Sequence, residues 1–200
     1  MSNTPNLKSA RLILASASPR RRELLAGLER PFEVIVPDID ETPRPREAPA
    51  SYVLRMAFEK AQAVFADLQS DVQELCLIAA DTTVVLGDRM LGKPADVDEA
   101  TAMLQSLSGN THNVITGLCV WTKDESGEHI RGEAVSTSVT FRKVSEAEIH
   151  HYAHSGEPMD KAGAYAIQGG AAGMVDHLDG SYTNVVGLPM ETLIRLLGER

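Results

Sequence analysis

Residues 16–21 have the sequence Ser-Ala-Ser-Pro-Arg-Arg and stand between a short apolar run and a helical pattern. Ser18 suits the N-cap of a helix, and Pro19 suits its first position, where a missing amide hydrogen costs nothing. The first amides of the helix carry the positive end of its dipole, and Arg20 and Arg21 add two cations there. The segment predicts a phosphate-binding loop. An ordinary capped helix with solvated arginines is the alternative.

Charged groups that could bind a metal ion or a phosphate occur at four further places. They are Asp38-Ile39-Asp40-Glu41 after a strand-like run, Lys60 in a long helical pattern, Asp81-Thr82 at the end of an apolar strand, and Lys93 in Gly92-Lys93-Pro94. Ligands of open α/β sheets bind at the carboxyl ends of strands, where Asp81 is expected. Carboxylates beside several cations indicate a divalent metal and a polyphosphate, since hard oxygen ligands hold Mg²⁺ and cations neutralise phosphates. A solvated surface of unrelated charges is the alternative.

The elements that position these groups alternate between strands and helices. Strand-like runs are expected at 12–15, 32–36, 76–80, 83–86, 114–122, 134–141 and 173–178. Residues 51–68 have apolar side chains at helical spacing, including Phe58, with Lys60 flanking the apolar stripe. The interleaving predicts an α/β fold, and residues 113–141 predict an antiparallel hairpin, so that helices flank a mixed, twisted sheet.

Three more helices have sequence signals at their ends. Asp96 is expected to cap a helix that ends at Gly109, and Ser145 with Glu148 forms a capping-box pattern for a helix that reaches about Ser155. A last helix is expected over residues 189–197.

Length and charge limit the class of protein. With 200 residues and 43% hydrophobic content, the chain can bury a substantial core, and we expect a frayed leader over residues 1–10 before a single domain over 11–200. A formal net charge of −9 argues against a nucleic-acid or anionic-membrane binder. No apolar run is long enough to span a membrane, and Cys76 and Cys119 suit buried, reduced thiols, so we expect a cytoplasmic protein.

Nine segments together carry a resemblance that no single motif would. They are 14–21, 40–42, 59–61, 80–82, 92–94, 107–112, 156–158, 160–169 and 186–189, in that order along the chain. With these segments the sequence is similar to the Maf family of nucleoside triphosphate pyrophosphatases over nearly its whole length. The resemblance implies a fold like that of the inosine triphosphatases, with two lobes around a central cleft, and a protein that is often a homodimer.

The activity that the resemblance implies is hydrolysis of a nucleoside triphosphate between its α and β phosphates with Mg²⁺ or Mn²⁺. Ser16 and Ser18 would bind phosphate oxygens, and the cations would hold the triphosphate, namely Arg20, Arg21, Lys60 and Lys93. Glu41 would help to hold the metal. Asp81 would be either the proton acceptor or a second metal ligand, and these two roles stay open because an Asp beside a cation is a weak base.

The segments around Thr82 and Gln168 resemble the subgroup that acts on dTTP and UTP. The amide of Gln168 can donate and accept at once, which matches the O4 acceptor and the N3–H donor of uracil or thymine. Arg20, Thr82 and Gln168 are therefore the predicted specificity residues. Alternatively, the Gln168 amide only ties down the adjacent Gly169-Gly170 loop.

Two other functions remain open. One is the N7-methyl-GTP pyrophosphatase activity of the sister subgroup, which Thr82 and Gln168 disfavour. The other is a nucleotide-binding regulator of septum formation, which would not need Asp81, Glu41 or the lysines. A link to cell-division arrest is also compatible with an enzyme.

Overall fold

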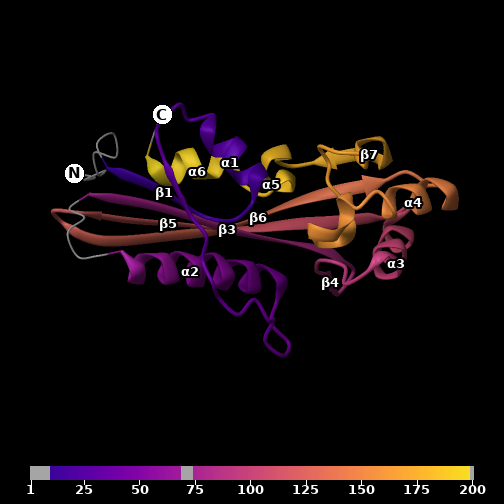
Figure 1. The fold of residues 1–200 in the computed structure, drawn as a ribbon, viewed down its shortest axis with the longest axis horizontal. Coiled ribbons are helices and arrows are strands. Elements are labelled where there is room, and N and C mark those ends of the chain that lie inside the picture. The colour runs from indigo at the N-terminus through magenta and orange to yellow at the C-terminus, as the bar shows by residue number, and fades with distance from the viewer. Residues whose placement is uncertain (1–9, 69–73, 199–200) are drawn as a thin grey trace. The chain divides into compact units, whose positions relative to one another are not determined.

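The computed structural model describes residues 10–68 and 74–198 (Figure 1). Residues 1–9 of the expected leader lie outside the described part. The strands are β1 (Arg11–Ala15), β2 (Glu33–Ile35), β3 (Leu75–Leu86), β4 (Arg89–Leu91), β5 (Thr111–Asp124), β6 (Gly127–Phe141) and β7 (Val175–Asp179). The α-helices are α1 (Pro19–Ala26), α2 (Pro49–Asp67), α3 (Val97–Leu107), α4 (Glu146–Ala153), α5 (Tyr182–Val186) and α6 (Met190–Leu197).

The described strands form one mixed sheet, which confirms the predicted α/β class. Its hydrogen-bonded order is β2-β1-β3-β5-β6-β7, and β4 pairs with β3 outside this path. β1 is parallel to both β2 and β3, whereas the β3–β4 and β6–β7 pairs are antiparallel. The hairpin between β5 and β6 also forms as predicted, since its strands are neighbours joined by a two-residue turn.

The chain divides into two compact units. The described part of the first comprises residues 10–68, 74–81, 116–135 and 187–198, and the second comprises 82–115 and 136–186. Strands β3, β5 and β6 contribute residues to both. The single domain expected over 11–200 stays a prediction.

The first unit has helices on both faces of its part of the sheet (Figure 1). On one face, Ile13, Leu77 and Ala79 pack with Ala57 and Ala61 of α2. Neighbouring strand residues of opposite parity pack on the other face against α1 and α6, for example Leu12, Leu14 and Ile78. This alternation is what a strand buried on both sides requires, because successive side chains point to opposite faces.

Helix α2 lies unusually close to strand β5. A Cβ on Gly117 would come within 2.3 Å of the backbone of Val53, so only glycine allows this approach. The buried side of α2 includes Met56 and Lys60, whereas Phe58, expected in the apolar stripe, is 37% exposed. The face that α2 presents to the sheet is therefore rotated from the one its apolar pattern predicted.

The second unit has its own core around α3 and α4. Met103 and Leu104 of α3 pack with Phe141, Ile149 and other buried side chains. The predicted caps form, since Asp96 accepts a hydrogen bond from the amide of Glu99, and Ser145 and Glu148 make a complete capping box. Across residues 10–68 and 74–198, no helix has both the length and the apolar character that a membrane crossing requires.

The strand boundary predicted at Asp81 is wrong. Asp81 and Thr82 were expected to end a strand, with a separate strand at 83–86, but β3 runs without a break from Leu75 to Leu86. The β-branched residues that follow Asp81 continue the strand, and the polarity of Asp81 is balanced by an ion pair rather than by a strand end. The pairing with β1 nevertheless ends at Ala79, so Asp81 lies just beyond the carboxyl end of that parallel pair.

Candidate functional site

The centre of the candidate site is the ammonium group of Lys60. Its Nζ atom lies 2.6 Å from Oδ1 of Asp81 and 2.6 Å from Oε1 of Glu41. The side chains of Lys60 and Asp81 are only 9% and 12% exposed, whereas that of Glu41 is 47% exposed. One cation thus holds a buried carboxylate and an accessible carboxylate together, all within the first unit.

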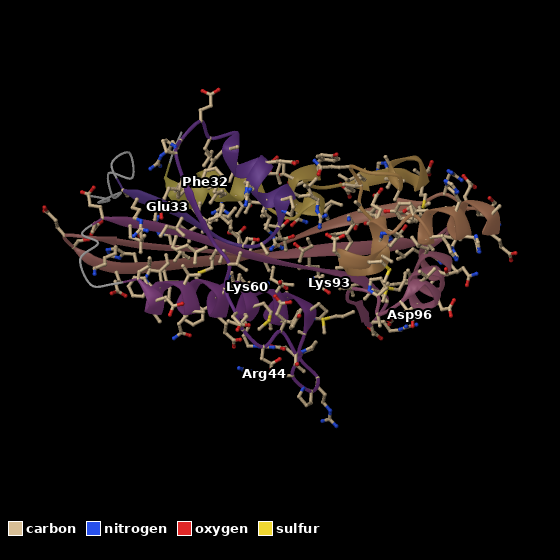
Figure 2. The ribbon with its side chains drawn as sticks, viewed as in Figure 1. Phe32, Glu33, Arg44, Lys60, Lys93 and Asp96 are labelled. Carbon is tan, nitrogen blue, oxygen red and sulfur yellow. The ribbon has the colours of Figure 1, made fainter. Side chains whose placement is uncertain are left out.

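Secondary structure brings Lys60 and Asp81 together. The side chains of Leu75, Leu77 and Ala79 pack on the face of the sheet that α2 covers, and Asp81 continues the same parity. Lys60 lies one helical turn beyond buried Met56, on the side of α2 that faces the sheet (Figure 2). A buried charge needs a partner, and each of these residues supplies it for the other.

The predicted serine loop forms at the carboxyl end of β1. Oγ of Ser18 accepts a hydrogen bond from the amide of Arg21 at 3.4 Å and caps α1, as predicted. Oγ of the buried Ser16 accepts one from the amide of Ser18 at 3.1 Å. The two hydroxyls thus fix the turn that leads from β1 into the N-terminus of α1.

Arg21 bends back toward the loop. Its Nε donates to the carbonyl of Gly187 at 2.8 Å, and its Nη1 donates to Oγ of Ser16 at 3.3 Å. Burial lowers the pKa of the Arg21 guanidinium, while the charges of Asp81 and Glu41 act in the opposite direction. The arginine therefore both braces the serine loop and shares an electrostatic environment with the two carboxylates.

The segment that carries Glu41 has no regular secondary structure. Oδ1 of Asp40 accepts hydrogen bonds from the amide and the hydroxyl of Thr42 at 2.9 and 2.6 Å, which forms a tight local turn and lowers the pKa of Asp40. Tyr52 and Arg55 of α2 donate to backbone carbonyls of the same segment. Sequence reasoning missed these two residues, although their spacing of three along the helix was visible.

The carboxylates around Lys60 are the candidate ligands of the divalent cation that the sequence predicts. Among the described residues, no group of three or more His, Cys, Asp and Glu side chains is arranged to hold a metal ion. Mg²⁺, however, commonly binds through one or two carboxylates together with water and substrate phosphates. Glu41 and Asp81 provide two carboxylates beside one ammonium group. The residues present therefore fit Mg²⁺ or Mn²⁺ bound together with a polyphosphate.

Three predicted site residues belong to the second unit. Thr82 is the first residue after the unit boundary in β3 and is half-buried, and Lys93 is exposed in the loop after β4. Gln168 is also exposed. The adjacent glycine loop is held by another residue, because the carboxylate of Glu157 accepts hydrogen bonds from the amide of Gly170 at 3.1 and 3.2 Å.

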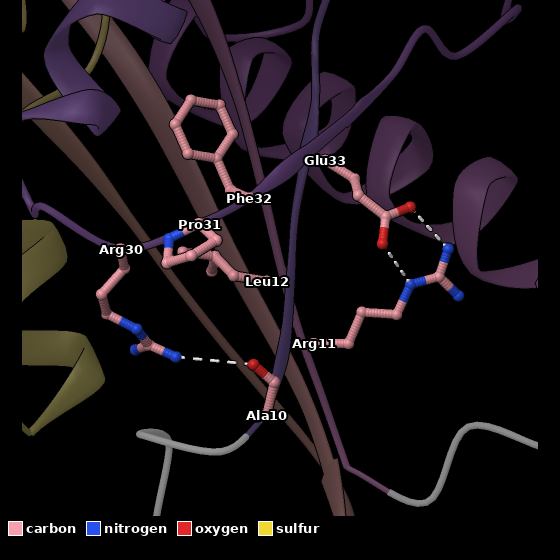
Figure 3. Close-up of a pocket in the computed structure, with 7 residues that line it drawn as sticks. All are labelled: Ala10, Arg11, Leu12, Arg30, Pro31, Phe32 and Glu33. Carbon is pink, nitrogen blue, oxygen red and sulfur yellow. Dashed lines mark hydrogen bonds and ion pairs between the residues drawn. The ribbon is translucent and has the colours of Figure 1, made fainter.

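A separate pocket lies at the opposite end of β1. It has a volume of about 350 Å³ and is lined by residues that include Arg11, Arg30, Phe32 and Glu33 (Figure 3). Arg11 and Glu33 form a two-point ion pair at 2.7 and 2.8 Å across its wall. Because this pocket is at the amino end of β1, it is distinct from the serine loop and from Asp81.

The fold and these residues define a mixed α/β protein with a serine loop that caps α1 and an ammonium–carboxylate cluster in the same unit. Residues 11–200 match the family model described as Maf-like protein. A dTTP/UTP pyrophosphatase of Hahella chejuensis is 49% identical over 94% of this chain and 92% of its own length. One of Myxococcus xanthus is 51% identical over 96% and 93%. The chain therefore belongs to the Maf family, which confirms the resemblance found in the sequence.

Among solved structures, a nucleoside-triphosphatase described as a dITP/XTP pyrophosphatase from Mycobacterium abscessus matches with a TM-score of 0.40 and 15% identity. The match covers 67% of this chain and 75% of that chain. So distant a likeness carries no argument about this site.

Proposed function

We propose that this protein is a nucleoside triphosphate pyrophosphatase that hydrolyses dTTP and UTP to the monophosphate and pyrophosphate. The observation that carries the proposal is the Lys60 ammonium held between Asp81 and Glu41, close to the serine loop in the chain's first unit. Relatives about half identical over nearly the whole chain carry the name dTTP/UTP pyrophosphatase, which supports the same chemistry here.

The phosphate groups are assigned to the serine loop and its cations. Ser16, Ser18 and the N-terminus of α1 would provide hydrogen-bond donors, and Arg20 and Arg21 would provide positive charge. Lys60 and Lys93 would neutralise the charge that builds up on the phosphates in the transition state. Because Arg21 is already braced against Gly187, little of its freedom would be lost on binding.

Asp81 is assigned the role of activating or orienting the water that attacks the α-phosphorus. The water oxygen forms a bond to phosphorus, the bond to the bridging oxygen breaks, and pyrophosphate leaves. As general base, Asp81 would take the proton of the water; as a metal ligand, it would orient the water. The Lys60 ammonium holds Oδ1 of Asp81 at 2.6 Å, which fixes the direction of the carboxylate and suits the orienting role.

Glu41 and Asp81 would hold the divalent cation. When bound, Mg²⁺ or Mn²⁺ supplies positive charge to the phosphates and acidifies a water molecule. Lys60, which contacts both carboxylates at 2.6 Å, would keep them near one another before the nucleotide arrives. The exposed Glu41 carboxylate is the more accessible of the two ligands.

Base recognition is assigned to Arg20, Thr82 and Gln168. The Gly169-Gly170 loop is held by Glu157, whose carboxylate accepts hydrogen bonds from the amide of Gly170. The amide of Gln168 is exposed and is not needed to hold this loop. This favours recognition of a uracil or thymine edge over the alternative that Gln168 only ties the loop down.

We also propose that the protein works as a cytoplasmic enzyme and as a homodimer. The buried, free thiols of Cys76 and Cys119 suit a reducing compartment. A link to cell-division arrest is proposed only from the family resemblance.

The test is pyrophosphate release by purified protein with Mg²⁺ from dTTP, UTP, CTP, GTP, ITP and N7-methyl-GTP. We expect release from dTTP and UTP well above the others. A preference for N7-methyl-GTP would keep the chemistry and overturn the base assignment. Binding without release from any nucleotide would overturn the enzyme and favour the nucleotide-binding regulator.

A further inference from the structure

The loop that carries Glu41 is fastened to the helix that carries Lys60. The phenol of Tyr52 donates a hydrogen bond to the backbone carbonyl of Glu41 at 2.9 Å. Nη2 of Arg55 donates to the backbone carbonyl of the next residue, Thr42, at 3.2 Å. Both donors lie on α2, one or two turns before Lys60, so one rigid element holds both ends of the Lys60–Glu41 ion pair.

Arg55 is itself held in place. Its Nε and Nη2 atoms make a two-point ion pair with Glu47 at 2.7 and 2.6 Å, and its Nη1 lies 3.2 Å from Oε2 of Glu59. The side chains of Arg55 and Glu47 are only 14% and 10% exposed. The hydrogen bonds from Arg55 lower the pKa of Glu47 to about 2, so the pair stays ionised near neutral pH.

These contacts have no evident purpose for the hydrophobic core. The loop between β2 and α2 is mostly exposed, and it buries little apolar surface. What the contacts do fix is the path of the backbone at Glu41 and Thr42, together with the Asp40 turn. A flexible glutamate on such a loop would lose more conformational entropy when it engages a ligand.

We infer that Tyr52 and Arg55 are positioning residues for Glu41, which hold its carboxylate at the Lys60 ammonium where a nucleotide-bound divalent cation is recognised. The inference rests on the proposed function for the identity of the ligand. The hydrogen bonds that carry it are independent of any ligand. Each residue would act through Glu41, because its hydrogen bond goes to the backbone of the segment that carries Glu41.

The test uses Tyr52→Phe, which removes a single hydroxyl, and Arg55→Gln, which removes the guanidinium that contacts Glu47 and the carbonyl of Thr42. The control is Arg11→Gln, because Arg11 makes a similar two-point pair with Glu33 at the far end of β1. Each change is also made in a Glu41→Gln background. Two quantities are measured: the Mg²⁺ concentration for half-maximal pyrophosphate release, and Mn²⁺ affinity by electron paramagnetic resonance with the α,β-methylene analogue of dUTP.

For Tyr52→Phe we expect the Mg²⁺ concentration for half-maximal release to rise about fivefold and the Mn²⁺ affinity to fall about fivefold. This is the effect of losing one neutral hydrogen bond. For Arg55→Gln we expect about tenfold or more, and no change for Arg11→Gln. In the Glu41→Gln background the same substitutions should have less than about a twofold further effect, because the residue that they position is already lost. A residue that merely stabilised the fold would act equally in both backgrounds.

Equal effects in the two backgrounds, or unchanged Mg²⁺ and Mn²⁺ dependence in the single variants, would overturn the inference. If Arg55→Gln does not fold, Arg55→Lys replaces it, because lysine keeps the positive charge but cannot make the two-point contact of the guanidinium. Arg55→Lys and Tyr52→Phe then test the inference together. If the wild-type protein releases no pyrophosphate, the proposed function fails. The Mn²⁺ titration of the same variants then still decides whether Tyr52 and Arg55 position Glu41.

Discussion

Lys60 of α2 and Asp81 of β3 form a buried ion pair, with Nζ and Oδ1 2.6 Å apart. The pair joins a helix to the middle of a strand, and Glu41 shares the same ammonium from an exposed loop. A buried pair of this kind is costly to break from one side, because the remaining charge is left without compensation. The candidate site is therefore coupled to the stability of the first unit.

Asp81→Asn should lower turnover of dTTP by about 10²–10⁴-fold, the usual contribution of a group that transfers or orients a proton. Nucleotide binding should persist, because the serine loop and the arginines remain. Single-turnover pyrophosphate release and nucleotide titration separate the two effects. Asp176→Asn, at an exposed position on β7, is the control. Undiminished turnover in Asp81→Asn would remove Asp81 from the mechanism.

Lys60→Met should destabilise the protein by about 3 kcal/mol, because Asp81 would stay buried without its partner. Adding Asp81→Asn to Lys60→Met should restore part of this loss, since the uncompensated charge is gone. Urea unfolding gives both values. Arg195→Gln breaks an equally short but exposed ion pair with Glu133 and should cost less than about 1 kcal/mol. Similar costs for the two single variants would contradict a buried, coupled site.

Gln168→Ala should lower kcat/KM for dTTP and UTP about tenfold while kcat/KM for CTP changes little, because only the former lose matched hydrogen bonds. The exposed position predicts an unchanged melting temperature. Gln105→Ala, exposed on α3, is the matched control. An equal loss for all three nucleotides would argue against a role in base selection.

Gly169→Ala should destabilise the protein by about 1–3 kcal/mol through lost hydrogen bonds. An added Cβ would lie 1.9 Å from Oε1 of Glu157, which accepts hydrogen bonds from Tyr152 and from the amide of Gly170. Gly173→Ala meets nothing within 4 Å and should change stability by less than about 0.5 kcal/mol. Thermal unfolding of both variants checks the prediction, which fails if they melt alike.

Acid should destabilise the protein through His112. Burial lowers the pKa of this histidine to about 4, from 6.5 when unperturbed. The unfolded chain therefore binds an extra proton between these values, so His112 favours folding fully above pH 6.5 and less as pH falls to 4. The loss amounts to about 3 kcal/mol. His112→Gln should flatten the dependence of unfolding free energy on pH in this window, and identical slopes for both proteins would exclude His112.

Local signals in the sequence determined much of the fold. Ser18, Asp96 and the Ser145–Glu148 box cap their helices as predicted, because capping depends on a few adjacent residues. The hairpin of β5 and β6 likewise follows from a short polar turn between two strand-like runs. The family resemblance also came from the sequence, because its motifs span the chain in order.

Only the tertiary structure decided how the charged groups meet. The apolar pattern of α2 placed Lys60 beside the buried stripe, and its burial depends on how the helix packs on the sheet. The same contact explains why Asp81 lies within β3 rather than at its end, since Lys60 compensates its charge there. The contact between Arg21 and Gly187 joins residues 166 positions apart, and Tyr52 reaches the carbonyl of Glu41 in a loop. Such contacts depend on packing between distant segments, which local sequence patterns do not encode.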